Sequence, residues 1–252
     1  MFTCFFAFCL ISANCFAQSD ATKVLEKNFT NIQVVELSLP SGCCYIEKNE
    51  GTDIRVLAAH SYKSKKAFET TFKTIDSVLL IKEKIDMTKR GFSVWKLMVP
   101  ENTYVKIYSG SGTIKINNIV GRIKINSISG NIFVENVKIS GNSEFESQSG
   151  SVNLTLEETP KYNILLSSES GIATLNLKSV INGKIEMKAQ ESVGEISCPF
   201  KFDKEWSIIY DHVYYMKSLT FGSETPVIRI FTYSGKAVLE DQINHQPNIG
   251  LE

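Results

Sequence analysis

One short phrase recurs along most of this chain: a glycine, then residues at which every second side chain is apolar (Gly-x-apolar-x-apolar). Ten copies are present, and they begin at Gly42, Gly112, Gly121, Gly130, Gly141, Gly150, Gly171, Gly183, Gly194 and Gly235. All ten residues four places after the glycine are apolar, and only Ser143 breaks the apolar set two places after it. Alternation with a period of two is typical of short β-strands that bury one face, so each copy predicts a strand.

The spacing of the copies predicts how these strands are connected. From Gly112 to Gly150 the successive glycines lie 9, 9, 11 and 9 residues apart, so two strands form a unit of about 20 residues. Serine often precedes the glycine, and glycine can adopt the positive φ of a turn. Strands and turns of fixed length favour a β-solenoid, in which equivalent side chains stack and each rung pairs with its neighbours. A β-sandwich has strands at similar spacing but seldom repeats one phrase.

The regular copies and the less regular flanks suggest how the chain is organised. We expect an all-β protein with one β-solenoid domain over residues 18–252, most regular over residues 101–198. Residues 18–100 and 199–240 should form irregular terminal caps, since end repeats must cover the core, and residues 241–252 should form a tail. Within the first cap, Phe68, Phe72 and Ile75 recur at helical spacing, which predicts one short helix over residues 64–75.

The first seventeen residues have the features of a secretory signal peptide. Phe2 to Phe16 is apolar and carries no charged side chain, and Ala17 completes a small-residue cleavage site. The run is shorter than the roughly 20 residues that span a bilayer. Acylation of Cys15 is the alternative, but Asn14 fits a lipoprotein signal poorly. We therefore expect an exported protein, in the periplasm, at the cell surface or outside the cell, with no membrane span in the mature chain.

The balance of charge limits the classes of partner. The chain has 27 basic and 27 acidic side chains, and none of them lies in the predicted signal peptide. Binding to nucleic acid requires an excess of lysine and arginine that displaces counterions. A nucleic acid is therefore not expected as a partner.

Three cysteines remain after the signal peptide is removed: Cys43, Cys44 and Cys198. With an odd number, at least one thiol is free or pairs between molecules. Two adjacent cysteines without a nearby histidine do not have the spacing of a zinc site. The repeat register predicts that Cys44 and Cys198 point inward, and that Cys43 points outward as the reactive thiol.

The repeated phrases also resemble a known family. Met98 to Pro100 and Val105 to Gly112, followed by Ser-Gly phrases, resemble the putative-adhesin β-solenoid domains of unknown function in bacterial envelope proteins. The Ser-Gly phrases are Ser129-Gly130, Ser149-Gly150, Ser170-Gly171 and Ser234-Gly235. The resemblance covers residues 30–240 and is best over 98–198. It implies the fold and assigns no functional residue, because the motif is structural. Pro160, where a glycine would be expected, and the irregular stretch 199–230 depart from the pattern.

Candidate chemistry is sparse. Residues 101–200 contain no aspartate, no histidine and one arginine, so the repeat offers no paired acid and base for catalysis. We predict no catalytic, metal-binding or cofactor-binding residue, and no cofactor. In the last third, Asp203, Asp211 and His212 could gather beside aromatic residues. Trp206, Tyr210 and Tyr214 are the candidate ligand contacts there, because aromatic rings stack on sugar rings.

These observations favour a non-enzymatic envelope or cell-surface protein, an adhesin-like binding or structural module whose partner is a surface glycan or a protein. The alternative is a carbohydrate-active enzyme, a polysaccharide lyase or hydrolase, with its site in the last third of the chain.

Overall fold

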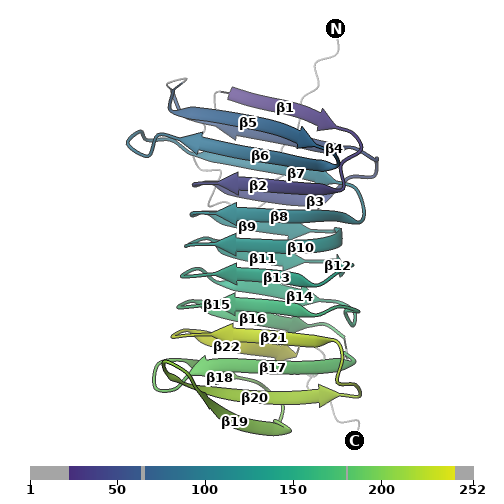
Figure 1. The fold of residues 1–252 in the computed structure, drawn as a ribbon, viewed down its shortest axis with the longest axis vertical. Helices are drawn as coiled ribbons and strands as arrows, with labels where there is room; N and C mark the ends of the chain where they lie inside the picture. The colour runs from purple at the N-terminus through teal and green to yellow at the C-terminus, as the bar shows by residue number, and fades with distance from the viewer. Residues whose placement is uncertain (1–22, 64–65, 180, 242–252) are drawn as a thin grey trace, which may run out of the picture.

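The computed structural model describes residues 23–63, 66–179 and 181–241. These residues form 22 β-strands and no helix, and the strands build two sheets stacked face to face along one long axis (Figure 1). Nothing helical that could cross a membrane is therefore present in this part of the chain. The predicted signal peptide, residues 1–17, and the predicted tail beyond residue 241 lie outside the described residues.

Both sheets run along the whole stack. The order in the 10-stranded sheet is β1 (Lys23–Phe29), β4 (Ile54–His60), β7 (Ser93–Val99), β3 (Cys43–Lys48), β9 (Thr113–Asn117), β11 (Asn131–Glu135), β14 (Val152–Leu156), β16 (Ile172–Leu177), β22 (Lys236–Asp241) and β18 (Glu195–Ser197). The order in the 12-stranded sheet is β19 (Lys204–Ile209), β20 (Val213–Phe221), β17 (Gly183–Gln190), β21 (Val227–Thr232), β15 (Ile164–Ser168), β13 (Ser143–Ser147), β10 (Val120–Ser127), β8 (Thr103–Ser109), β2 (Val34–Leu39), β6 (Val78–Ile85) and β5 (Phe68–Ile75), with β12 (Lys138–Ile139) beside β10.

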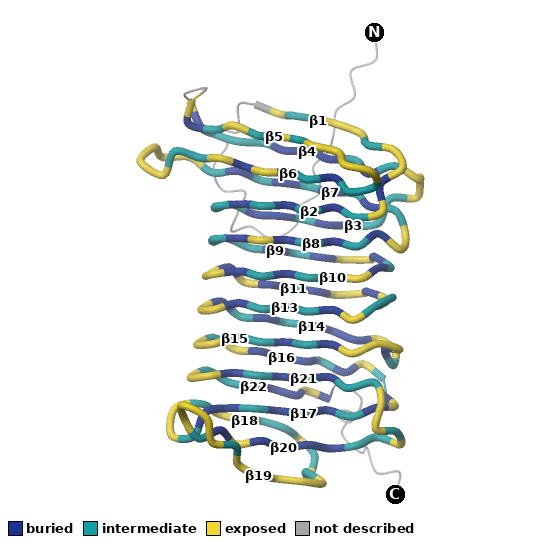
Figure 2. The backbone as a smooth tube through the Cα atoms, viewed as in Figure 1, coloured by how far each residue is buried: buried dark blue, intermediate teal, exposed yellow. Residues whose placement is uncertain are grey.

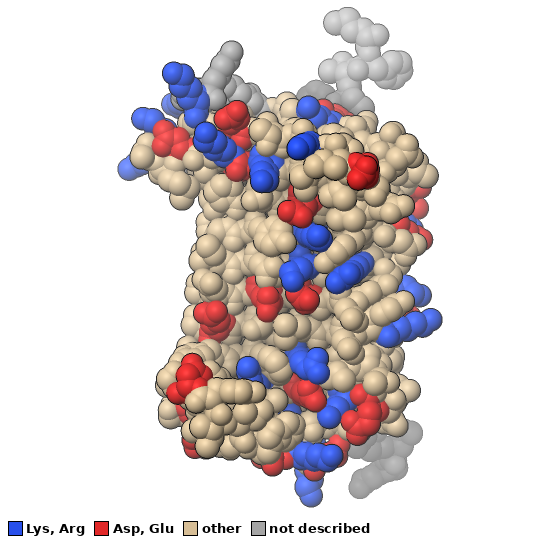
Figure 3. Space-filling view, viewed as in Figure 1, with Lys and Arg blue, Asp and Glu red and all other residues tan. Residues whose placement is uncertain are grey.

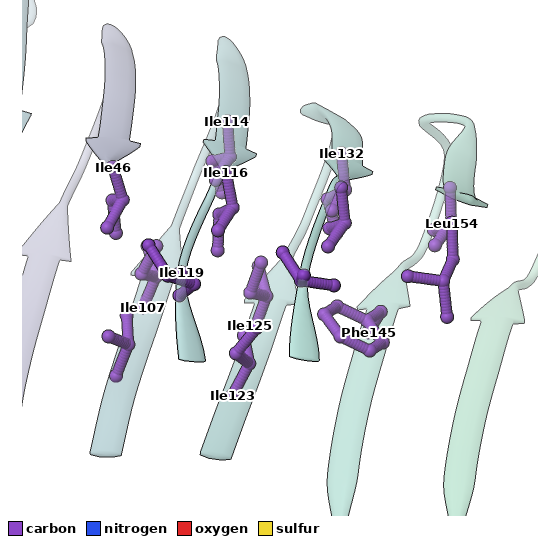
Figure 4. Close-up of a cluster of buried hydrophobic side chains, with 14 of the residues drawn as sticks. Ile46, Ile107, Ile114, Ile116, Ile119, Ile123, Ile125, Ile132, Phe145 and Leu154 are labelled. Carbon is purple, nitrogen blue, oxygen red and sulfur yellow. The ribbon is translucent and has the colours of Figure 1, made fainter. Parts of the chain in front are cut away.

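The repeat forms the expected ladders of apolar side chains. In one sheet Ile114 lies beside Ile132, and Ile132 lies beside Val152; in the other, Ile125 lies beside Phe145. All five side chains are fully buried, and Figure 4 shows such residues pointing into the space between the sheets. Paired residues are 18 or 20 positions apart in the sequence. The predicted β-solenoid with rungs of about 20 residues is confirmed.

Segments from the two flanks are inserted into the stack out of chain order. β2 and β3 lie between the β8–β9 rung and the strands β6 and β7, and β21 and β22 lie between the β15–β16 rung and the strands β17 and β18. The outlying copies that begin at Gly42 and Gly235 therefore continue the same ladders as the central ones. Strand pairing is parallel through the centre, and antiparallel pairs such as β5–β6 and β19–β20 lie at the two ends.

The predicted helix over residues 64–75 is wrong. Phe68 to Ile75 forms strand β5, which pairs antiparallel with β6 at the end of the 12-stranded sheet. A spacing of four places Phe68 and Phe72 on one side of a strand as well as on one side of a helix. The β-branched residues Thr70, Thr71 and Thr74 favour the strand.

One carboxyl group lies inside the core near the N-terminal end of the stack. Glu83 of β6 is only 5% exposed, and it accepts a hydrogen bond at 2.5 Å from the indole Nε1 of the fully buried Trp95. Its second oxygen has no hydrogen-bond partner in the described chain. Burial raises the pKa of the Glu83 carboxyl, and the hydrogen bonds from Trp95 and Ser93 only partly oppose this. Exposed residues, by contrast, lie at the corners and ends of the stack (Figure 2).

Candidate ligand-binding surface

One corner of the solenoid, where strands of the 12-stranded sheet turn into the 10-stranded sheet, is built from Ser-x-Ser-Gly phrases. The first serine of each phrase is buried, and in two of the phrases it joins two rungs. The hydroxyl of Ser147 accepts a hydrogen bond from the N–H of Gly150 at 2.9 Å and donates one to the carbonyl of Gly130 at 3.0 Å. Ser168 makes the same two contacts with Gly171 and Gly150, at 2.9 and 2.8 Å. A serine ladder therefore holds the corner at a fixed shape.

The glycines at this corner are required by close approach. A Cβ on Gly150 would lie 2.1 Å from the carbonyl oxygen of Gly130, and one on Gly171 would lie 2.5 Å from that of Gly150. The sequence predicts that these glycines occupy turns of positive φ. Among the repeat glycines a positive φ is found at Gly42, Gly112 and Gly183. At Gly150, Gly171 and Gly235 a side chain is excluded instead because the backbone of the preceding rung occupies the space that a Cβ would need.

A groove of about 540 Å³ follows this corner across successive rungs, at the arrowhead ends of β8, β10, β13 and β15 in Figure 1. We call it the corner groove. It is lined by Ser38, Leu39, Pro40, Tyr108, Ser109, Gly110, Asn126, Ser127, Ile128, Glu146, Ser147, Gln148, Ser167 and Glu169. The sheet register stacks one row of these, Ser38, Tyr108, Asn126, Glu146 and Ser167, on five successive strands. The groove thus presents polar side chains of differing type at equivalent positions on successive rungs.

The corner groove offers side-chain groups rather than backbone groups. The backbone is occupied by the ladder: the N–H of Gln148 donates to the carbonyl of Ser127, and that of Ser149 donates to the carbonyl of Ile128, both at 3.0 Å. Within the part of the chain that the structure describes, no hydrogen bond involves the side chains of Asn126, Gln148 or Ser167. These groups remain able to bind a ligand.

The charge in the groove is negative. Glu146 is half-buried, and Glu169 is exposed beside it. Burial raises the pKa of the Glu146 carboxyl, the charges of Glu144 and Glu169 raise it further, and Lys124 lowers it. Lys124 itself is paired with Glu144. In Figure 3 charged side chains gather over the front sheet, and few lie on the left edge where the corner runs.

The three predicted ligand contacts lie on the C-terminal hairpin of β19 and β20. Trp206 is 38% exposed and Tyr210 is 74% exposed, whereas Tyr214 is 9% exposed. The ring centroids of Tyr210 and Tyr214 are 6.5 Å apart. The register places Trp206 opposite Met216, two residues from Tyr214, so Trp206 and Tyr214 occupy the same face of the hairpin. Trp206 and Tyr210 are accessible, and the buried Tyr214 packs beside Tyr210.

Residues from other segments complete this aromatic surface. Tyr233 lies 6.2 Å from Tyr214, centroid to centroid, and its backbone N–H donates to the carbonyl of Glu169 at 3.1 Å. Lys188 Nζ lies 5.0 Å from the Tyr214 ring and 4.6 Å from the Phe231 ring. Sequence reasoning missed Tyr233, Phe231 and Lys188, because only the strand order brings them beside the hairpin. We call Trp206, Tyr210, Tyr214, Tyr233 and Phe231 the aromatic patch; it meets the corner groove at Glu169.

The acidic residues proposed for a catalytic alternative do not come together. Asp203 and Asp211 lie at opposite ends of the six-residue strand β19, which separates them by roughly 20 Å. Asp203 accepts a hydrogen bond from the N–H of Thr220 at 2.6 Å, and Asp211 accepts one from the N–H of His212 at 3.0 Å. Both carboxylates are thus engaged by backbone N–H groups, Asp203 by strand β20 across the hairpin and Asp211 by the next residue in the turn. The described residues contain no group of three or more His, Cys, Asp or Glu placed to hold a metal ion.

The prediction for the cysteines is partly wrong. Cys44 is fully buried, as expected, but Cys43 is only 9% exposed. It lies opposite Val94 within the 10-stranded sheet, where larger neighbouring side chains leave a thiol little exposure. Cys198 is half-buried and packs against the core, and its sulfur accepts a hydrogen bond from the N–H of Phe200 at 3.4 Å.

A second hollow, of about 610 Å³, lies at the opposite corner near the N-terminal end, and its lining includes Lys48, Glu50 and Glu101. Lys48 Nζ is 3.0 Å from Glu101 and 3.4 Å from Glu50. Its charged groups are therefore already paired within the protein, which makes it a weaker candidate than the corner groove.

Comparisons with known proteins agree with the fold. Residues 100–198 match the family model of Toastrack DUF4097, and this segment runs from the start of β8 to the end of β18. The family match confirms the predicted resemblance, which was strongest over the same residues. A search of curated proteins finds no match.

Several solved structures match most of this chain at low sequence identity. A putative cell adhesion protein from Clostridium sporogenes is 16% identical, with a TM-score of 0.43 over 87% of this chain and 100% of that chain. A putative adhesin from Bacteroides fragilis is 12% identical, with a TM-score of 0.30 over 88% and 98% of the two chains. A putative adhesin from Parabacteroides distasonis is 13% identical, with a TM-score of 0.33 over 87% and 97%.

Proposed function

We propose that this protein is an exported, non-catalytic binding module of the cell envelope or cell surface, which holds an extended polymer in the corner groove. The observation that carries the proposal is that the groove presents a polar side chain at the equivalent position of each successive rung. Asn126 and Ser167 lie in one row, two rungs apart, and their side chains make no hydrogen bond within the described chain. A polymer that contacts several rungs gains affinity from many weak contacts, without one deep pocket.

The placement of the acids supports a non-catalytic role. General acid–base catalysis requires groups within hydrogen-bond reach of the reacting atoms. Asp203 and Asp211 lie at opposite ends of β19, and each accepts a hydrogen bond from a backbone N–H. In the groove, Glu146 and Glu169 lie beside each other, and the lining residues include no histidine that could act as a base for one of the serines.

Export is supported by the sequence alone. The apolar run from Phe2 to Phe16, followed by Ala17, has the features of a cleaved signal peptide. The mature chain then begins at Gln18, and N-terminal sequencing of secreted material tests this. A lipid on Cys15 would contradict it and would attach the protein to a membrane.

Retention on immobilised polymers tests the binding role. Residues 18–252 are passed over neutral glycans, acidic glycans and extended peptides, and both retention and chain cleavage are measured. We expect retention on one class, with no cleavage. Replacing Asn126 and Gln148 by Ala should weaken retention. The matched control is Asn153→Ala on the outer face of β14, a half-exposed asparagine outside the groove.

Two results would overturn the proposal. The first is retention that is equal for the groove variant and the Asn153→Ala control, or that is absent from all three polymer classes. The second is cleavage of a glycan that disappears in Asp203→Asn or Asp211→Asn, which would favour a carbohydrate-active enzyme.

A further inference from the structure

The rows of the corner groove repeat at the spacing of the strands. Neighbouring strands in a sheet lie about 4.8 Å apart. Tyr108, Asn126, Glu146 and Ser167 therefore present one polar side chain per rung at this interval along the solenoid axis. The exposed turn residues Ile128, Gln148 and Glu169 form a second row beside the first, because successive turns also pair through their backbones. A ligand in the groove therefore meets side chains at the same spacing and in the same two rows on each rung.

We infer that the polymer held in the corner groove is an extended neutral glycan, laid along the solenoid axis with one sugar residue per rung. This inference rests on the proposed function and names its ligand. A pyranose residue in an extended chain advances by roughly one strand spacing. Its hydroxyl groups are both donors and acceptors, as are the amides of Asn126 and Gln148 and the hydroxyl of Ser167. Successive sugars can then each form a hydrogen bond with the side chain of a different rung.

The backbone of the corner distinguishes a glycan from a peptide. An extended peptide binds a sheet by adding a strand to a free edge, with main-chain hydrogen bonds supplying the affinity. In the corner groove the N–H groups of Ile128, Gln148 and Glu169 already donate to the preceding rung, at 3.0, 3.0 and 3.1 Å. The groove also runs across the strands rather than along a sheet edge. A peptide bound in the groove could contact side chains, but the backbone N–H groups that it would pair with are already used.

The charge of the groove selects a neutral chain over an acidic one. Glu146 and Glu169 line it, and neither lysine nor arginine is among the lining residues. The nearest cations on the sheet are engaged, since Lys124 pairs with Glu144 and Lys106 Nζ lies 3.7 Å from Glu36. An acidic polysaccharide would place like charges beside Glu146 without compensation.

The aromatic patch extends the groove at one end. Tyr233 joins it to Glu169, and the exposed rings of Trp206 and Tyr210 lie beyond. An aromatic ring stacks on the apolar face of a pyranose, which gives a sugar at the end of the chain a different contact from the hydrogen bonds along the rungs. The patch should therefore add affinity for chains long enough to leave the groove.

Calorimetric titration with β-1,4-linked N-acetylglucosamine oligomers of increasing length tests the inference. The dissociation constant should fall with each added sugar until the chain covers the five strands of the row. Replacing Asn126 and Gln148 together by Ala should weaken binding about tenfold, and Asn153→Ala should leave it unchanged. Glu146→Gln removes a negative charge from the groove and should strengthen the binding of a galacturonate oligomer of matched length.

The outcomes separate the inference from the proposed function. Affinity that does not depend on oligomer length would overturn the match of one sugar per rung. Groove-dependent binding of an extended peptide or of galacturonate, with no binding of the neutral oligomers, would overturn the neutral glycan but leave the binding module intact. If the Asn126 and Gln148 replacements affect the binding of none of these probes, both the inference and the proposed function are wrong.

Discussion

The indole Nε1 of Trp95 donates a hydrogen bond to the carboxylate of Glu83 across 2.5 Å, inside the core between β6 and β7. The two strands belong to opposite sheets, so this contact joins the sheets near the N-terminal end of the stack. The charged form of Glu83 is disfavoured there, because a buried carboxylate is poorly solvated and its second oxygen has no partner in the described chain.

Glu83 should make the stability of this end depend on pH. Burial raises its pKa in the folded protein above the ordinary value of 4.5. The folded state therefore holds the proton over a range where the unfolded state has lost it, and the free energy of unfolding should fall as pH rises through that range. Glu83→Gln keeps an oxygen acceptor for Trp95 and cannot ionise. In denaturant melts, the free energy of unfolding of Glu83→Gln should rise relative to that of the parent protein between acidic and neutral pH. A difference between the two proteins that does not change with pH would contradict the raised pKa of Glu83.

Inward-pointing and outward-pointing positions of the rungs should differ sharply in their tolerance of alanine. Ile125 is fully buried, and Ile125→Ala should lower the free energy of unfolding by ~2–5 kcal/mol through lost burial and a cavity. Lys115 points outward from β9, and Lys115→Ala should change the free energy of unfolding by about 0.5 kcal/mol or less. Denaturant melts of both variants measure this. Equal losses would show that the register is wrong.

The glycine ladder predicts that a single methyl group disrupts the corner. In Gly150→Ala the new Cβ would lie 2.1 Å from the carbonyl oxygen of Gly130, a backbone atom that is held in the ladder. We expect a loss of about 2 kcal/mol or more in unfolding free energy. The matched control is Gly51→Ala, whose Cβ would have no neighbour closer than 3.5 Å and should be tolerated. Equal stability of the two variants would mean that the rungs can separate at the corner.

Exposure predicts the order in which the thiols react. Cys44 is fully buried, and burial raises the pKa of its thiol. Cys198 is only half-buried, although burial also raises the pKa of its thiol. Brief alkylation of the native protein, followed by mass spectrometry, should modify Cys198 before Cys43 and Cys44. Denatured protein serves as the control, in which all three should be modified. Faster labelling of Cys43 would contradict its burial.

The central fold could be predicted from the sequence because one period of apolar residues fixes both the strand and its buried face. Ile116 and Ile125 were assigned to the core by counting from a glycine, and both are buried. The caps could not be predicted in the same way. Phe68 and Phe72 are four residues apart, a spacing that fits a helix or a strand, and only the pairing with β6 decides between them.

The candidate site was harder to predict than the fold. Trp206, Tyr210 and Tyr214 are close in sequence, so composition alone pointed to them. Tyr108 and Ser167 of the corner groove are far apart in sequence, and nothing in their chemistry separates them from other polar residues of the repeat. They line the same groove only because the strand register places them in one row.

The inserted rung of β21 and β22 limits the order in which the chain can fold. It is made from residues 227–241, yet it separates the rung of residues 164–177 from β17 and β18, residues 183–197. A solenoid with rungs in chain order can grow stepwise from its neighbours. Here β17 has no place on the growing stack until residues synthesised after it have formed β21. The C-terminal end of the stack must therefore close in one concerted, long-range step, which is expected to be slower than the addition of the central rungs.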